Sequence, residues 1–185
     1  MTTQPQAMPR DYGRLMRRSM ARACIALLLG AMSLIAPVTA NVAVGQNASG
    51  LPLPRFVSFR AAEVNMRTGP GIQYPVDWVY SRRSLPVEII AEFETWRKVR
   101  DWEGTQGWVH QSLLSGKRTV IVTGETRNLR ASPDAASRIV ARVEPSVIGE
   151  LNDCSAGWCR ISIEGYQGWL RHVDMWGVYK EEAFE

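Results

Sequence analysis

The sequence reads Glu-Val-Asn-Met-Arg-Thr-Gly-Pro at residues 63–70 and Thr-Arg-Asn-Leu-Arg-Ala-Ser-Pro at residues 126–133. Two further matches follow in the same order. The stretch Trp-Arg-Lys-Val at 96–99 returns as Trp-Cys-Arg-Ile, and Gly-Trp-Val at 107–109 returns as Gly-Trp-Leu. Because the spacing between the copies is nearly constant, these matches indicate two tandem copies of one structural unit.

Each unit has the pattern of short β-strands. Val64 and Met66 alternate with polar neighbours, and residues 85–89 and 96–101 alternate in the same way. Strict alternation marks strands that are buried on one face. Clusters of turn-forming residues separate these segments, as in Gly69-Pro70-Gly71. No helical period stands out after residue 40, so the sequence predicts an all-β protein made of two small barrels.

The N-terminus has the layout of a secretory signal peptide. Four arginines lie within residues 14–22, an apolar run covers 23–36, and Val38-Thr39-Ala40 offers small residues at a cleavage site. The run of about 14 apolar residues is shorter than the roughly 20 that cross a bilayer. We expect a signal-peptide helix within residues 1–40, cleaved after Ala40, with no membrane span afterwards. An uncleaved anchor is the alternative, and the export route, general or twin-arginine, stays open.

The net positive charge of the chain comes from this N-terminal segment. Residues 1–40 hold five of the 22 basic and one of the 18 acidic residues, which leaves 17 of each in the remainder. A formally neutral mature chain lacks the basic surface that nucleic acid requires, so we expect no nucleic-acid partner. The predicted location is periplasmic or secreted.

Two cysteines remain after cleavage, Cys154 and Cys159. An even count in an exported chain favours a disulfide. Ala156-Gly157 would form the bend of a hairpin, which places the two cysteines opposite each other on adjacent strands. The first unit has Glu92 and Arg97 at the matching positions. The disulfide is therefore predicted for the second unit alone.

We divide the chain by composition and by the repeat. The predicted parts are a signal peptide, a linker rich in Gly and Pro, a first barrel, a second barrel and a short tail: 1–40, 41–55, 56–118, 119–179 and 180–185.

The repeated motifs resemble those of the bacterial SH3 (SH3b) domain. Residues 65–71, Asn-Met-Arg-Thr-Gly-Pro-Gly, are similar to its opening motif, and residues 128–133 match less fully because Asp134 replaces the second glycine. Gly107-Trp108-Val109 and Gly168-Trp169-Leu170 are similar to its closing strand. The resemblance covers about 56–179 and implies two tandem SH3-like barrels. We expect Arg67 and Arg130 to keep their charged ends in water. We also expect Gly107 and Gly168 to tighten a turn before a buried tryptophan.

The sequence offers little for catalysis. His110 and His172 each follow a Gly-Trp strand, and no Gly-x-Ser-x-Gly motif is present. Domains of this family often accompany cell-wall hydrolases with Cys-His catalytic domains, and none is evident here. An oxidised Cys154–Cys159 pair supplies no thiolate nucleophile and, with His172 alone nearby, too few ligands for zinc. We predict that the protein is not an enzyme and has no cofactor and no metal site.

The aromatic residues suggest a binding surface on the first unit. Residues 56–118 contain nine aromatic residues and residues 119–179 contain five. Two copies of one barrel need similar numbers of aromatic residues in their cores. We therefore expect some of the additional aromatic residues of the first unit to be exposed and to bind a ligand. Alternatively, Trp78 and Tyr80 lie on one face of a strand and cap the core. The predicted ligand-binding residues are Tyr74, Trp78, Tyr80, Arg82, Arg83, Trp96 and Trp102.

Two functions fit these features. The first is a cell-wall binding protein that recognises peptidoglycan through its stem peptide or its glycan, which the family resemblance favours. The second is an interaction module for another periplasmic or secreted protein. Both would be non-catalytic.

Overall fold

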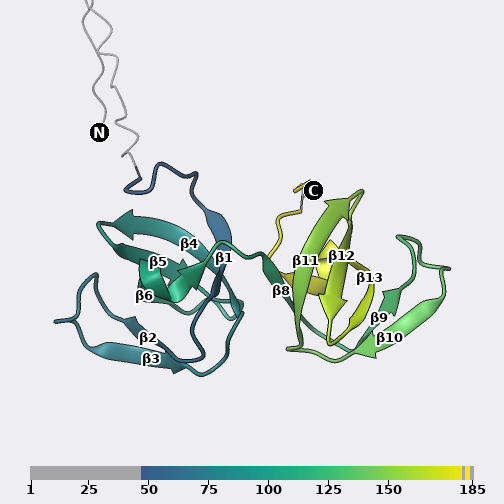
Figure 1. Ribbon diagram of the computed structural model, residues 1–185, viewed down its shortest axis with the longest axis horizontal. Helices are drawn as coiled ribbons and strands as arrows, with labels where there is room; N and C mark the ends of the chain where they lie inside the picture. Colours follow the sequence, from purple (N-terminus) through teal and green to yellow (C-terminus); the bar gives the residue numbers. More distant parts are fainter. Residues whose placement is uncertain (1–46, 181, 184–185) are drawn as a thin grey trace, which may run out of the picture. The chain divides into compact units, whose positions relative to one another are not determined.

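A computed structural model of the chain describes residues 47–180, 182 and 183. The predicted signal peptide lies outside the described residues. In this part of the chain the regular structure consists of strands and two short 3-10 turns, which confirms the all-β prediction (Figure 1). None of its helices has the length and apolar character that a membrane crossing requires.

The first barrel is one antiparallel seven-stranded sheet in the order β3-β2-β6-β5-β4-β1-β7. Strand β3 lies at one edge of this sheet and pairs with β2 alone. A 3-10 turn, η1 (Gln111–Leu113), precedes the last strand. The strands are β1 (Arg55–Phe59), β2 (Val64–Arg67), β3 (Val76–Tyr80), β4 (Pro86–Phe93), β5 (Trp96–Arg100), β6 (Gln106–His110) and β7 (Leu114–Ser115).

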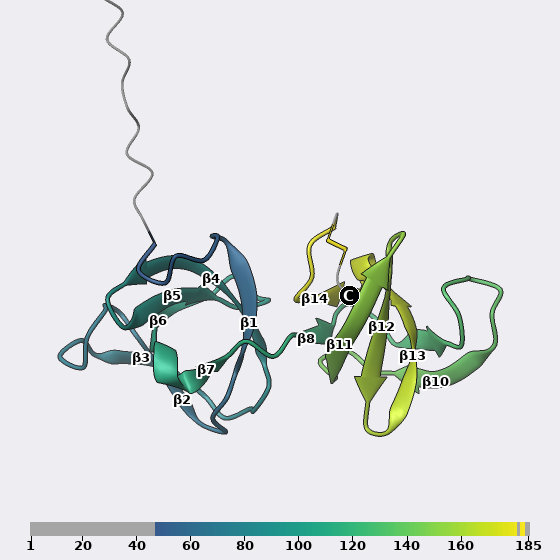
Figure 2. The same ribbon diagram turned by 45° about the horizontal axis from the view of Figure 1, so that its top comes forward.

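The second barrel repeats this sheet element for element, in the order β10-β9-β13-β12-β11-β8-β14 (Figure 2). The register repeats too: Arg67 pairs with Trp108 in the first barrel, and Arg130 pairs with Trp169 in the second. The predicted tandem repeat is thus confirmed. The elements are β8 (Thr119–Val122), β9 (Arg127–Arg130), β10 (Ile139–Val143), β11 (Ile148–Ser155), β12 (Trp158–Ile163), β13 (Tyr166–Arg171), η2 (His172–Asp174) and β14 (Met175–Trp176).

The repeated glycines have a different role from the one predicted. Gly107 and Gly168 lie inside strands β6 and β13, not in turns. A Cβ at Gly107 would lie 2.5 Å from the Met66 side chain, and one at Gly168 would lie 2.7 Å from Leu129. Met66 and Leu129 are fully buried. Glycine therefore allows the strand to pass close over a fully buried residue of each core.

The predicted disulfide is confirmed. Cys154 on β11 and Cys159 on β12 form a cross-strand pair with a Cα–Cα distance of 4.1 Å. The connecting residues Ala156 and Gly157 have φ angles of 49° and 82°. Positive φ at both positions is typical of the two-residue turn that matches the twist of a hairpin. Both cysteines are buried in the second core.

Side chains of the second repeat also contact the first barrel. The Phe56 ring lies 4.9 Å from that of Trp176 and 4.6 Å from that of Tyr179, between centroids. The Tyr179 hydroxyl donates a hydrogen bond of 2.9 Å to Glu88. Phe56 is consequently buried. Part of the aromatic surplus of the first barrel is therefore used in packing rather than exposed.

Candidate functional site

Exposed apolar side chains gather on one segment of the first barrel. Trp78 on edge strand β3 is 55% exposed, and Tyr74 in the loop before it is 39% exposed. Of the ten large hydrophobic side chains that are exposed in the described part of the chain, five lie in this segment. We call them the apolar strip: Ile72, Tyr74, Val76, Trp78 and Val79.

Tyr80, which was predicted as a ligand-binding residue beside Tyr74 and Trp78, is buried and does not belong to this surface. Its side chain is 6% exposed and packs in the first core. Its hydroxyl donates a hydrogen bond of 2.7 Å to Oδ2 of Asp101. Burial, together with this bond to a carboxylate, raises the pKa of Tyr80 above its ordinary value. Tyr80 is a core residue with a satisfied hydroxyl.

The other predicted site residues are dispersed. Arg82 and Arg83 are exposed, and Nε of Arg83 donates to the carbonyl of Arg60 at 2.9 Å. Trp96 is half-buried and meets His110 edge-on, with ring centroids 5.4 Å apart. Trp102 is also half-buried and packs against the first core. In the described residues no ring contact joins Trp96 or Trp102 to the apolar strip.

The motif arginines hold the long loop of each barrel. Nη1 of Arg67 donates to the carbonyls of Ile72 and Tyr74 at 3.2 and 2.7 Å. Nη1 of Arg130 donates to the carbonyl of Ser137 at 2.6 Å. These bonds differ from the expectation that both guanidinium groups face water. Arg67 thereby fixes the loop that carries the start of the apolar strip.

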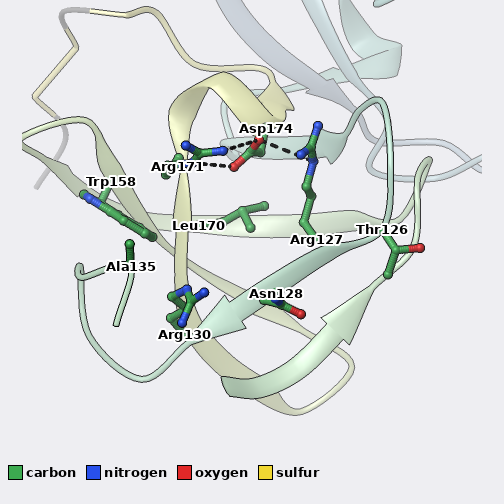
Figure 3. A pocket seen from close by; sticks show the side chains of 9 residues that line it. All are labelled: Thr126, Arg127, Asn128, Arg130, Ala135, Trp158, Leu170, Arg171 and Asp174. Atoms are coloured by element: carbon green, nitrogen blue, oxygen red, sulfur yellow. Dashed lines mark hydrogen bonds and ion pairs between the residues drawn. The ribbon is translucent and has the colours of Figure 1, made fainter. Parts of the chain in front are cut away.

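The second barrel contains a cleft that the sequence did not suggest (Figure 3). Its volume is about 310 Å³, and it lies between β9, the long loop after β9, the start of β12, and the end of β13 with η2. The lining residues are Thr126, Arg127, Asn128, Arg130, Ala135, Trp158, Leu170, Arg171 and Asp174.

A charged cluster occupies one side of this cleft. Asp174 is 5% exposed and accepts hydrogen bonds from Nε and Nη2 of Arg171 at 2.9 and 3.2 Å. Nε of Arg127 lies 3.3 Å from Oδ1 of the same carboxylate. The hydrogen bond with Asp174 raises the pKa of Arg171 above its ordinary value.

Comparison of the two repeats contained a signal for this cluster. Arg127 corresponds to Val64 as the first residue of its strand, since each pairs with the last residue of the following strand. Arg171 corresponds to His110, because they pair with Trp158 and Trp96 respectively. Asp174 and Leu113 each end the 3-10 turn. The second repeat thus has a charged residue in place of a different residue of the first repeat at three positions, and all three line this cleft.

Comparison with known proteins identifies the unit that both barrels represent. The bacterial SH3 domain family matches residues 60–116 and 123–177. The chain belongs to the bacterial SH3 domain family. The two matched regions correspond to the two sheets, so the chain carries two bacterial SH3 domains in tandem.

Solved structures similar to these tandem SH3 domains include two proteins from Trichomonas vaginalis, NlpC2 and NlpC1, each 16% identical to the chain with TM-scores of 0.33 and 0.32. Both matches cover 70% of this chain, with 50% of NlpC2 and 48% of NlpC1. An NlpC/P60 family protein from Bacillus cereus is 15% identical over 65% of this chain and 55% of its own, with a TM-score of 0.30. The chain spans about half the length of these proteins. No curated protein matches the chain.

The two histidines of the SH3 domains have local structural contacts. Nδ1 of His110 lies 2.7 Å from Oγ of Ser112 and accepts from the Ser112 amide at 3.3 Å, which caps η1. Nδ1 of His172 lies 2.9 Å from the carbonyl of Gly157. In the described residues neither histidine has an acidic partner that would complete a nucleophile–base–acid arrangement.

Proposed function

We propose that the protein is an exported, non-catalytic binding protein that recognises cell-wall peptidoglycan through its first SH3 domain. The apolar strip carries this proposal. Isolated exposed hydrophobic side chains are common, whereas several that gather on one segment favour an interaction surface. The flat faces of Tyr74 and Trp78 suit sugar rings and the apolar parts of peptides. Both are exposed enough to be reached, at 39% and 55%.

Charge that follows the apolar strip in the sequence fits the same ligand. Arg82 and Arg83 follow β3 directly and are exposed. Guanidinium groups bind carboxylates through paired hydrogen bonds, and the stem peptides of peptidoglycan carry carboxylates. At the rim of a surface such charges steer a ligand more than they hold it.

The disulfide supports an extracytoplasmic location. Cys154 and Cys159 are bonded, and structural disulfides persist in oxidising compartments such as the periplasm and the cell exterior. This location gives the protein access to the cell wall. It fits the predicted signal peptide as well.

A second function is favoured by one feature of the same segment. Strand β3 is an edge strand, and its outer backbone groups have no neighbouring strand in the sheet. Such an edge can accept an extended strand from another protein. An interaction module for another exported protein therefore remains the alternative proposal.

Sedimentation with purified sacculi tests the wall-binding proposal. The protein should pellet with sacculi, and Trp78→Ala should weaken its affinity by about tenfold, the effect of losing an aromatic anchor. The matched control is Tyr166→Ala, which removes an aromatic ring of similar exposure, 56%, from the second domain. This control should bind like the wild type.

Three results would count against the proposal. Wild-type protein that stays in the supernatant rejects peptidoglycan as the ligand. Equal loss of binding in the Trp78→Ala and Tyr166→Ala variants removes the first domain as its site. Unchanged binding by a folded Trp78→Ala variant excludes the apolar strip.

A further inference from the structure

The cleft of the second domain combines an apolar floor with an excess of positive charge. Leu170 is 2% exposed and forms the floor, and half-buried Trp158 stands at one side near Ala135 of the long loop (Figure 3). Three guanidinium groups and one carboxylate line the cleft, which leaves an excess of two positive charges. A cleft with one sign of charge attracts ligands of the other sign.

The charges are not equally engaged. Asp174 forms ion pairs with both Arg127 and Arg171, and this cluster, which keeps a net charge of +1, links η2 to strand β9. Arg130 stands outside it, since in the described part of the chain no carboxylate forms an ion pair with Arg130. Its one hydrogen bond uses Nη1, which donates to the Ser137 carbonyl. The remaining donors of this guanidinium are available at the cleft.

Existing contacts also hold the arginines in place. Arg171 is fixed by two hydrogen bonds to Asp174, and Arg130 by its bond to the long loop. Long side chains that are already ordered lose less conformational entropy when a ligand binds. The cleft thus presents arginines that are already partly ordered by contacts within the domain.

The first domain shows that the fold does not require this charge. It keeps the counterparts of Arg130 and Trp158, which are Arg67 and Trp96. The counterparts of Arg127 and Asp174 are apolar residues, and that of Arg171 is a histidine. The second domain therefore differs from its twin at all three residues of the Arg127–Asp174–Arg171 cluster, and these differences add one net positive charge to the cleft.

We propose that this cleft binds the carboxylate end of a short peptide, with the carboxylate at Arg130 and the adjoining small side chain over Leu170 and against Trp158. The planar fork of arginine matches a carboxylate. An apolar floor beside the charge favours an organic acid over inorganic phosphate, which has no apolar part. A volume of about 310 Å³ suits one or two small residues.

This second site does not depend on peptidoglycan being the ligand of the first domain. Its test uses dissolved peptides and no cell wall, so the two proposals fail separately. The probes are N-acetyl-Ala-Ala with a free C-terminal carboxylate, the same dipeptide as its C-terminal amide, and inorganic phosphate. Each is titrated into the isotopically labelled full-length exported protein, and binding is followed by NMR chemical shifts.

The free acid should shift the signals of Arg130, Leu170 and the Trp158 indole, and the amide should not. Arg130→Gln should weaken binding of the free acid by about tenfold or more, since a charge-assisted pair is lost. The matched control is Arg160→Gln, which removes an exposed arginine of the same domain outside the cleft. It should bind like the wild type.

Four outcomes would overturn the proposal. The first is that the free acid causes no shifts up to about 10 mM, a concentration that reveals even millimolar affinities. The second is that the acid and the amide cause equal shifts, and the third is that the Arg130→Gln and Arg160→Gln variants lose binding equally. The fourth is that phosphate binds as tightly as the acid at the same residues. Because Arg130→Gln also removes a bond to the long loop, Arg171→Gln serves as a second variant. It should weaken binding too. The comparison of acid with amide needs no substitution at all.

Discussion

The two SH3 domains secure the same hairpin by different chemistry. In the second domain the disulfide Cys154–Cys159 joins β11 to β12. In the first domain the equivalent cross-strand pair is Glu92 and Arg97, with Nε of Arg97 3.3 Å from Oε1 of Glu92. A disulfide joins two residues only. The carboxylate of Glu92 has further acceptor sites, and these bind a segment far away in the sequence.

That segment lies just before the first strand and includes its first residue. Glu92 accepts hydrogen bonds from the amide and hydroxyl of Ser49 at 2.8 and 2.7 Å, and from Nη2 of Arg55 at 2.6 Å. Residues around Ser49, predicted from composition to be a linker, are therefore attached to the first barrel. The ion pair of the first domain therefore also holds a segment outside the hairpin, which a disulfide at the same position would not do.

The two cores also differ in that the first contains a polar contact where the second is apolar. The first core contains the hydrogen-bonded pair Tyr80 and Asp101. Their counterparts in the second core are Val143 and Ile163, which are buried and apolar. The first domain thus relies on polar contacts at two places where the second domain uses a covalent bond and hydrophobic packing.

The largest effect should come from breaking the buried polar pair. Asp101 accepts hydrogen bonds from the Tyr80 hydroxyl and from the amides of Glu103 and Thr105. Asp101→Ile, which copies the second domain, should lower the free energy of unfolding of the first domain by about 3 kcal/mol because a buried hydroxyl loses its acceptor. Hydrogen exchange of first-domain amides measures this loss.

A double variant sharpens the same test. Adding Tyr80→Phe to Asp101→Ile removes the unpaired hydroxyl and keeps the aromatic ring in the core. It should recover part of the lost stability, because removing both partners costs less than removing one. An Asp101→Ile variant as stable as the wild type would show that the pair does not stabilise the first domain.

Reduction of the disulfide should have the next largest effect and should be confined to the second domain. The bond closes a short loop, with a sequence separation of 5. The chain-entropy estimate for so short a loop is about 2 kcal/mol of unfolding free energy. Hydrogen exchange with and without reductant should show faster exchange in the second domain only. Two free thiols in the oxidised protein, or equal acceleration in both domains, would contradict this expectation.

The ion pair should make the first domain sensitive to acid. Burial acts to raise the pKa of Glu92, but hydrogen bonds from Ser49 and Arg55 outweigh it and hold the pKa below its ordinary value of 4.5. A carboxyl group with a lowered pKa stabilises the fold fully above its unfolded pKa. This contribution is lost as the pH falls through the lowered folded value.

Denaturation of the first domain at neutral and acidic pH measures this contribution. The wild type should lose about 1 kcal/mol more than the Glu92→Gln variant on acidification, a typical net contribution of one hydrogen bond. Cys154 and Cys159 do not titrate when bonded, so the matching hairpin of the second domain provides the internal reference. Parallel pH profiles for the wild type and the variant would exclude Glu92 as the source.

Much of the fold was predictable because the repeat placed related residues at related positions. The two Gly-Trp strands and the motif before each long loop predicted the two tandem domains. The short spacing of Cys154 and Cys159 around Ala156-Gly157 gave the hairpin disulfide. These are local signals, and local geometry determines what they form.

The site was less predictable for two physical reasons. Alternation assigns Trp78 and Tyr80 to one face of a strand, but it does not say how far the core extends beneath that face. Tyr80 lies over the core, whereas Trp78, next to a register irregularity between Met66 and Arg67, lies beyond it. The cleft of the second domain is formed by residues from β9, the long loop after it, β12, β13 and η2, which meet only in the folded barrel.

The smallest change in stability should come from Trp78→Ala. Trp78 pairs with Met66, as Ala141 of the second domain pairs with Leu129, so the substitution gives the first domain the residue of its twin. Because Trp78 is 55% exposed, its loss should change the free energy of unfolding by about 0.5 kcal/mol or less, as at other surface positions. Tyr80→Ala, two residues away, also breaks the buried polar pair and should instead cost about 3–5 kcal/mol because it empties part of the core as well. Thermal melts of both variants, run beside the sacculus assay, separate a surface aromatic from a core one. A sharply lowered melting temperature for Trp78→Ala with undiminished affinity would place Trp78 among the packing residues and remove the apolar strip as the binding surface.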